Sequence, residues 1–264
     1  MSVNGCSSVG IVGAGIQGVC IGLQLLKKNI STTIFDSKDP GSMASYGNAG
    51  HFSPYAVLQL NRPDILYDVP KMLFSSYGPL ALKWNYIPKM LPWILGYLKN
   101  CNKKSMIHTA KNMHQILNLS MDAYDEVFQE IDATNLLEKK GIIYIWTNQN
   151  LKSRELEIKV RNDLGVKQKI LSTKEILDLE PNLKPVFTGG AYYDYAYHAR
   201  DPYGIVKKIF ELFIQRGGKF INENVESVKQ STNNETSIRT EKKEYKFEKS
   251  VIACGAFSKK LTDQ

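Results

Sequence analysis

Three glycines near the amino terminus have the spacing of a phosphate-binding turn. They form Gly13-x-Gly15-x-x-Gly18 within VGIVGAGIQGVCIG. In this pattern the first glycine permits a tight turn, the second lets the backbone approach a pyrophosphate, and the third lets a helix pack closely on a strand. The start of that helix offers N–H groups and a positive dipole to phosphates. We therefore interpret this turn, including Ala14 and Ile16, as a nucleotide-binding site.

An acidic residue follows the turn at the distance that the motif requires. Asp36 ends TTIFD, a β-branched and aromatic run that predicts a second strand. Its carboxylate can accept hydrogen bonds from ribose hydroxyls and would repel a 2′-phosphate. Strands at 9–12 and 32–35 and a helix at 16–28 then form a βαβ unit. The alternative is a glycine-rich buried turn beside a surface aspartate, but the order of strand, turn, helix and acid favours nucleotide binding.

A loop of small polar residues follows Asp36. It contains DSKDPGSMASYGNAGHFSP, in which glycine, serine and asparagine predominate. The turn by itself does not distinguish NAD from FAD, but a simple NAD domain usually continues into another helix at this point. Small residues let backbone N–H groups approach a flat, polar ring system, so the loop favours FAD. An ordinary mobile loop is the alternative.

The elements that must position these residues alternate between helix and strand. Prolines break the first half of 57–131 into short helices, and 104–131 predicts one long helix. Ser172 and Glu175 form a capping box that starts a short helix. Further helices are predicted at 151–162 and 202–216, and strands at 141–146, 190–195, 219–222, 225–229, 236–240, 244–247 and 250–253.

Composition excludes several classes of site. The 264 residues are 43% hydrophobic and carry a net charge of +8, with four cysteines and no Cys-x-x-Cys pair. We therefore expect no structural metal and a reduced, cytoplasmic setting. The lysines are scattered and form no arginine-rich recognition helix, so we expect no nucleic-acid partner. A solvated lysine-rich surface, an anionic membrane or an anionic ligand remain as explanations of the charge.

Seven segments carry a resemblance to a known family. They are VGIVGAGIQGVCIGLQLL, TTIFD, SYGNAGHFSP, LEPNL, TGGAYYD, DPYGI and VIACGAFS. In this order they resemble the FAD-dependent D-amino-acid dehydrogenases of the D-amino-acid oxidase and glycine oxidase superfamily. The resemblance implies an α/β fold, with a Rossmann-like FAD-binding domain at 1–56 and 198–264. An incomplete α+β substrate domain at 57–197 would be interleaved with it.

The resemblance also implies roles for individual residues. Gly13, Gly15 and Gly18 would hold the FAD pyrophosphate, and Asp36 the adenosine ribose. Val225 would contact the adenine through its backbone, and Ala253 and Gly255 would approach the nucleotide at the end of the last strand. The diphosphate and isoalloxazine would be lined by Ser42, Ser45, Asn48, Ala49 and Gly50.

The implied reaction is oxidative deamination of a D-amino acid. A hydride would leave the substrate Cα for flavin N5, and the imine would hydrolyse to a 2-oxo acid and ammonia. A quinone or another acceptor would then take the electrons. The chain ends at Gln264, before the place where the family carries its carboxylate-binding arginine. We therefore expect a truncated gene product, half of a split protein or a fragment, which needs a C-terminal partner chain for turnover. A non-catalytic FAD-binding subunit and an NAD-linked dehydrogenase are the alternatives.

One further segment has the composition of a membrane-binding surface. Asp68 to Lys104 combines tryptophans, tyrosines and lysines, and its lysines and prolines exclude a membrane span. We expect peripheral contact with the inner face of the membrane. The alternative is an amphipathic lid packed on the substrate domain.

Overall fold

The computed structural model describes residues 6–74, 83–147, 151–230 and 235–262. The chain forms two compact units, and each is described here by itself. Unit 1 contains Met1–His51, Asp125–Glu138 and Ala199–Gln264, and unit 2 contains Phe52–Tyr124 and Lys139–His198. The predicted division into cofactor and substrate domains stays a prediction, because compactness does not show which part binds a ligand.

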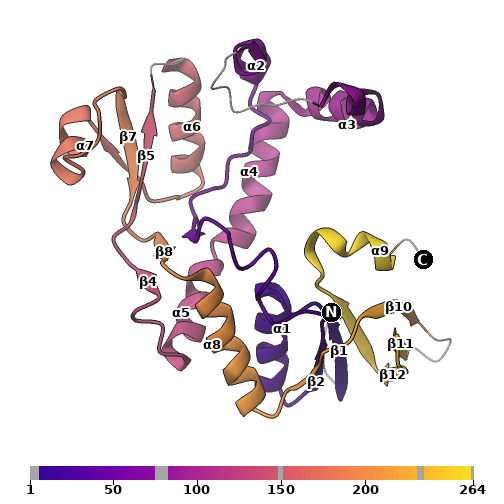
Figure 1. Ribbon diagram of the computed structural model, residues 1–264. Coiled ribbons are helices and arrows are strands. Elements are labelled where there is room, and N and C mark those ends of the chain that lie inside the picture. The colour runs from indigo at the N-terminus through magenta and orange to yellow at the C-terminus, as the bar shows by residue number, and fades with distance from the viewer. Residues whose placement is uncertain (1–5, 75–82, 148–150, 231–234, 263–264) are drawn as a thin grey trace. The chain divides into compact units, whose positions relative to one another are not determined.

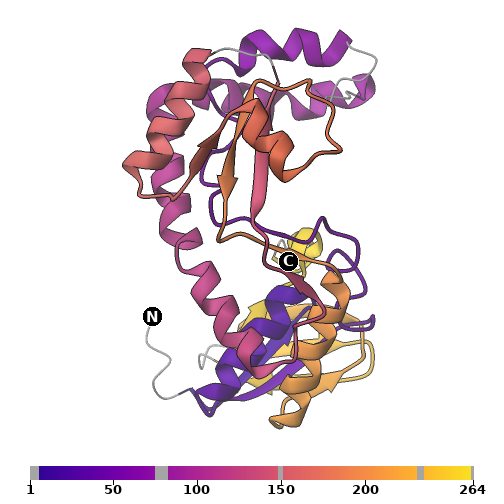
Figure 2. The same cartoon turned by 90° about the vertical axis from the view of Figure 1, so that its left-hand side faces the viewer.

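The centre of unit 1 is a parallel sheet (Figure 1). Its strands are β1 (Ser8–Val12), β2 (Ser31–Phe35), β9 (Lys219–Ile221) and β13 (Lys249–Ile252), in the order β13-β1-β2-β9. The register places Ile11 beside Val251 on one side and Ile34 on the other. Two helices, α1 (Ile16–Lys27) and α8 (Pro202–Gln215), pack side by side (Figure 2). The predicted βαβ unit is thereby confirmed.

An antiparallel sheet covers part of the parallel one. It consists of β10 (Val225–Gln230), β11 (Thr236–Thr240) and β12 (Glu244–Phe247). Alternate residues of a strand point to opposite faces. Val12 and Phe35 pack against Ile238 in one core cluster, whereas Ile34 meets α1 at Gly22. The two buried faces explain why β1 and β2 are buried at every position after the first.

Unit 2 combines helices with a small antiparallel sheet. Its sheet has the order β5-β7-β6, from β5 (Ile142–Trp146), β6 (Lys169–Leu171) and β7 (Gly189–Tyr193). Stacked Tyr55 and Tyr193, with ring centroids 3.8 Å apart, belong to its core. The helices are α2 (Ile65–Phe74), a 3₁₀ turn (Trp84–Tyr86), α3 (Ile87–Asn100), α4 (Lys103–Leu117), α6 (Leu151–Asp163) and α7 (Thr173–Leu179).

The sequence prediction was wrong about the long helix at 104–131. The structure divides it into α4 and α5 (Ser120–Glu130). The Ser120 hydroxyl donates to the Leu117 carbonyl at 2.6 Å. A serine that bonds the backbone in this way competes with the helical hydrogen-bond ladder, which accounts for the break.

The predicted capping box at Ser172 is confirmed. The Ser172 side chain accepts from the Glu175 N–H, and the Glu175 carboxylate accepts from the Ser172 N–H at 2.8 Å. These bonds hold the pKa of Glu175 below its usual range.

The sequence analysis missed several short strands: β3 (His51–Phe52), β4 (Leu137–Glu138), β6 and β8 (Tyr197–Ala199). Each has two or three residues, which are too few to show a periodicity.

We predict that Phe213 anchors the helical layer of unit 1. Its ring is fully buried between α1 and the residues that follow α8. Phe213→Ala should lower the free energy of unfolding by about 3–5 kcal/mol, because it leaves a cavity. Ile214→Ala, at an exposed position of the same helix, should cost under about 1 kcal/mol. Urea unfolding followed by circular dichroism measures both, and equal midpoints would contradict the prediction.

Candidate nucleotide-binding site

The turn between β1 and α1 is built from backbone contacts. Gly13 has φ +110°, and a Cβ there would lie 2.4 Å from the Ala253 carbonyl oxygen. A Cβ on Gly18 would lie 1.9 Å from the Gly13 carbonyl oxygen. The turn, the first turn of α1 and the end of β13 therefore touch with no room for side chains between them.

Ser45 reaches the amino terminus of α1 from the loop. Its hydroxyl oxygen accepts from the Ile16 N–H at 3.1 Å, and the residue is buried. The first N–H groups of a helix have no acceptor within the helix, so the serine takes the place of one. A Cβ built on Gly15 meets only this hydroxyl, at 3.4 Å. The space in front of the helix is thus bounded by N–H groups and a hydroxyl.

The Asp36 carboxylate is held beside the same turn. Its oxygens accept from the Ala14 N–H at 2.8 Å and from the Lys38 N–H at 3.0 Å. Asn222, directly after β9, donates its amide N–H to the Asp36 carbonyl at 3.0 Å. Asn222 was not singled out from the sequence. Its position at the carboxyl end of a parallel strand was the signal that could have identified it.

The end of β13 completes this edge of the sheet. The Ala253 N–H donates to the Val12 carbonyl at 2.7 Å, and the Cys254 thiol donates to the same carbonyl at 3.2 Å. Burial and the nearby Asp36 charge raise the pKa of Cys254, so the thiol stays protonated at neutral pH. Gly255 follows in a 3₁₀ turn (Gly255–Phe257).

The small-residue loop is fixed at both ends. The Gly41 N–H donates to the Ala14 carbonyl at 2.9 Å, and the Ala199 N–H donates to the Gly50 carbonyl at 2.7 Å. Asn48 braces the loop internally, because its side chain donates to the Ser45 carbonyl and accepts from the Gly50 N–H. These bonds make the loop an ordered part of unit 1.

The structure brings together part of the predicted set. Ala14, Ile16, Asp36 and Ser45 are joined by hydrogen bonds, and Gly13, Gly18 and Ala253 by backbone contact. The Ser42 hydroxyl instead donates to the Asp39 carbonyl, and Ala49 is exposed. Val225 pairs with Thr240 at the start of β10. Among the described residues, no group of three His, Cys, Asp or Glu side chains could hold a metal ion.

Comparisons with known proteins identify the class. Residues 8–264 match the family model described as FAD dependent oxidoreductase (DAO), and the chain belongs to this family. It is 30% identical over 257 residues to the D-amino-acid oxidase of Bradyrhizobium diazoefficiens, covering 96% of this chain and 61% of that protein. It is 26% identical over 248 residues to a D-amino acid dehydrogenase of Helicobacter pylori, covering 93% and 59%. The chain thus spans about three fifths of the length of these relatives.

Solved structures share the fold at low identity. Glycine oxidase from Geobacillus kaustophilus has a TM-score of 0.64 and 18% identity, covering 97% of this chain and 57% of that one. L-proline dehydrogenase from P. horikoshii has a TM-score of 0.65 and 15% identity, covering 98% and 55%. The predicted Rossmann-like fold and family are both confirmed.

The packing of the turn predicts that alanine substitution costs much more stability at one of its glycines than at another. Gly18→Ala should lower the free energy of unfolding by about 3 kcal/mol, because the new methyl group meets a backbone oxygen that cannot move freely. Gly15→Ala should change it by less than about 1 kcal/mol, since its Cβ makes only an ordinary contact. Thermal and urea unfolding of both variants provide the measurement. Equal stabilities would refute the described packing of α1 on the turn.

Proposed function

We propose that the chain binds FAD at the β1–α1 turn and serves a D-amino-acid oxidoreductase. One observation carries the proposal: the start of α1, the Ser45 hydroxyl and the Asp36 carboxylate gather around the open position at Gly15. This set fits a dinucleotide, because N–H groups and a hydroxyl suit a pyrophosphate and a carboxylate suits a ribose.

Each element of the site would have a distinct task. The pyrophosphate would meet the backbone of the turn without steric hindrance, at Gly13, Ala14, Gly15, Ile16 and Gly18. Asp36 already accepts two backbone hydrogen bonds, and an ionised carboxylate has capacity for more. The other proposed contacts are Ser42, Ser45, Asn48, Ala49 and Gly50 for the diphosphate and flavin, and Val225, Ala253 and Gly255 for the adenosine side.

The flavin would supply the hydride-accepting chemistry, and the protein would supply orientation and electrostatics. The positive end of α1 would offset phosphate charge. Ser45 would keep its place at the helix start through the bond to Ile16. The two-ended anchoring of loop 41–50 would hold backbone N–H groups ready without an ordering cost on binding.

D-amino acids are the proposed substrates, since the curated relatives reported above are a D-amino-acid oxidase and a D-amino acid dehydrogenase. A quinone or another acceptor would receive the electrons. Because those relatives are longer, we further propose that turnover requires the counterpart of their remaining two fifths, on this or another chain. Dye reduction with a panel of small D- and L-amino acids, with and without that counterpart fused or in trans, tests this. Turnover by residues 1–264 alone would overturn the requirement.

We predict that FAD, and not NAD, binds the purified chain. Gly15→Val should weaken FAD binding by at least about 100-fold, because its methyl groups occupy pyrophosphate space while the fold remains. Titration calorimetry and visible flavin absorbance measure the effect. Gly96→Val is the matched control, since a Cβ at Gly96 meets nothing within 4 Å. Tight NAD binding without FAD affinity would contradict the proposal.

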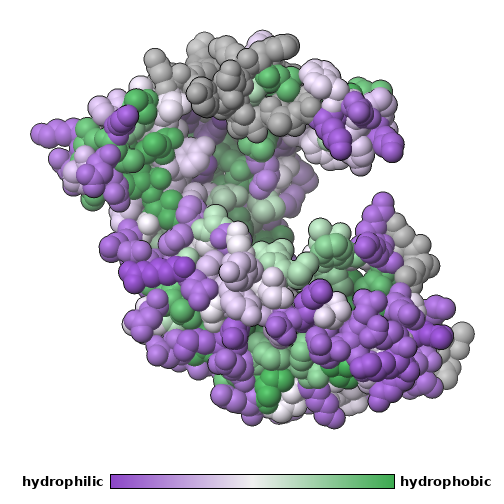
Figure 3. Space-filling model, viewed as in Figure 1, coloured by the Kyte–Doolittle hydropathy of each residue, from purple (hydrophilic) through white to green (hydrophobic). Residues whose placement is uncertain are grey.

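We also propose that α3 and the turn before it bind an anionic membrane surface peripherally. No residue of α3 is buried, and Trp84, Trp93 and Leu95 are exposed by 67%, 64% and 59%. Residues 83–104 contain five lysines and no acidic residue. Hydrophilic and hydrophobic atoms lie side by side over α3 (Figure 3). Part of the predicted segment, 75–82, lies outside the described residues. Among the helices that the structure does describe, none combines the length and the hydropathy of a membrane span.

Vesicle sedimentation tests this surface. The chain should sediment with vesicles rich in anionic lipid and less with neutral ones, and added salt should release it, because screening weakens the lysine–headgroup attraction. Trp93→Ala and Lys89→Glu should each reduce binding. Ile116→Ala, exposed on α4, is the control. Equal recovery in the supernatant with both vesicle types would instead support the lid interpretation.

A further inference from the structure

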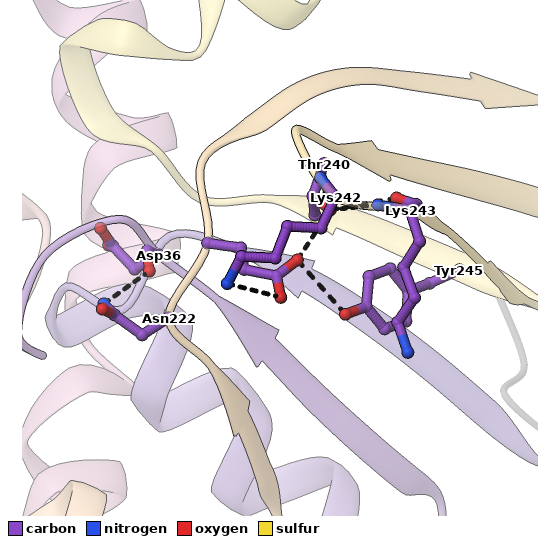
Figure 4. A network of polar contacts seen from close by, with 7 residues as sticks. Asp36, Asn222, Thr240, Lys242, Lys243 and Tyr245 are labelled. Atoms are coloured by element: carbon purple, nitrogen blue, oxygen red, sulfur yellow. Dashed lines mark hydrogen bonds and ion pairs between the residues drawn. The ribbon is translucent and has the colours of Figure 1, made fainter.

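A partly buried carboxylate outside the proposed set follows Asn222, the residue that bonds Asp36. Glu223 belongs to the connection between β9 and β10, and its side chain is 11% exposed. It accepts from the Thr240 hydroxyl at 2.7 Å and from the Tyr245 hydroxyl at 3.3 Å, and the Lys242 ammonium lies 3.4 Å away (Figure 4). One side chain thus joins the β9–β10 connection to both strands and the turn of the β11–β12 hairpin.

The partners of Glu223 are themselves fixed. Thr240 is buried, and its hydroxyl oxygen also accepts from the Lys242 and Lys243 N–H groups, each at 3.2 Å, which closes the hairpin turn. The Tyr245 ring packs edge-on against Phe35, the residue before Asp36, with centroids 4.9 Å apart. The hairpin is therefore attached to the end of β2 through an aromatic contact and to the connection through Glu223.

The groups around Glu223 stabilise its ionised form. The Thr240 hydrogen bond, with the Lys242 charge and the Tyr245 hydroxyl, holds the pKa of Glu223 below its usual range despite burial. Burial and the Glu223 charge raise the pKa of Tyr245, so its hydroxyl remains a donor. The 2.7 Å contact from the Thr240 hydroxyl is a charge-assisted hydrogen bond, which is stronger than a neutral one, whereas the 3.3 Å contact from Tyr245 is longer and weaker.

The same connection also touches the proposed ribose-binding residue. Asn222, adjacent to Glu223, donates to the Asp36 carbonyl, and the Asp36 N–H donates to the Ile221 carbonyl at 3.2 Å. Val225, the residue proposed to contact the adenine, lies two residues after Glu223. Residues 222–225 are consequently held by Asp36 at one end and by the hairpin at the other.

We propose that Glu223 is a positioning residue for the adenosine half of the cofactor: it fixes residues 222–225 so that Asn222 keeps Asp36 aimed at the ribose. This inference rests on the proposed FAD site and extends it to a residue that does not itself contact the ligand. Under this proposal the β11–β12 hairpin contributes to binding of the adenosine half as well as to packing.

The experiment measures binding of FAD, ADP and 2′-deoxy-ADP by calorimetry. Glu223→Ala should weaken ADP and FAD binding about tenfold, the scale of losing hydrogen bonds to a charged group. The ratio of the affinity for ADP to the affinity for 2′-deoxy-ADP, which is the ADP preference, should fall towards one. Glu223→Gln keeps acceptors for Thr240 and Tyr245 and should recover most of the preference. Glu226→Ala, an exposed glutamate three residues later that pairs with Arg239, should leave both quantities unchanged.

Two further variants cover a failure of Glu223→Ala to fold. Thr240→Val and Tyr245→Phe each remove one hydroxyl from the network with little change of shape, and each should lower the ADP preference. Amide hydrogen exchange of 222–225 should rise in the ligand-free variants. An unchanged preference, or an affinity loss equal for both nucleotides, would overturn the positioning role while leaving the FAD site intact. A wild-type chain that binds neither FAD nor ADP would overturn the proposed function itself.

Discussion

The direct contact of backbone with backbone at the β1–α1 turn is the constraint on which unit 1 depends. Gly18 brings α1 onto the carbonyl of Gly13, and Gly13 brings the turn onto the carbonyl of Ala253. A methyl group at either glycine would separate these elements. The contact therefore fixes where the helix starts, which directs the N–H groups of its first turn, including the Ile16 N–H that donates to Ser45, to one point at the edge of the sheet. It also brings the end of β13, which is far along the sequence, back to this turn.

Parallel strands end at the same edge, and this explains why residues far apart in sequence meet there. Asp36 follows β2, Asn222 follows β9 and Ala253 follows β13, while Ser45 arrives from a loop. This edge combines the amino terminus of α1, the Ser45 hydroxyl and the Asp36 carboxylate, and hydrogen bonds from backbone N–H groups hold the two side chains in place. Membership in the FAD dependent oxidoreductase family fits an edge arranged in this way.

The two faces of the parallel sheet divide the structural tasks. One face packs α1 and α8 around Phe213, and the other receives the hairpin through Ile238 and Tyr245. Glu223 links that hairpin to the β9–β10 connection by hydrogen bonds to its carboxylate, in addition to the apolar packing. The outer surface over β10–β12 is largely hydrophilic (Figure 3), consistent with a layer buried on its inner side only.

The sequence alone determined the local elements: the glycine spacing predicted the turn, the β-branched runs predicted β1 and β2, and the Ser172 box predicted α7. These signals depend on neighbouring residues, so they are visible in the chain order. The tertiary structure decided the bond from Ile16 to Ser45 and the network around Glu223. Strand β8 and the hairpin register likewise follow from pairing. Those features require groups distant in sequence to meet, and a one-dimensional pattern carries no record of which buried polar atoms find each other once the chain has packed.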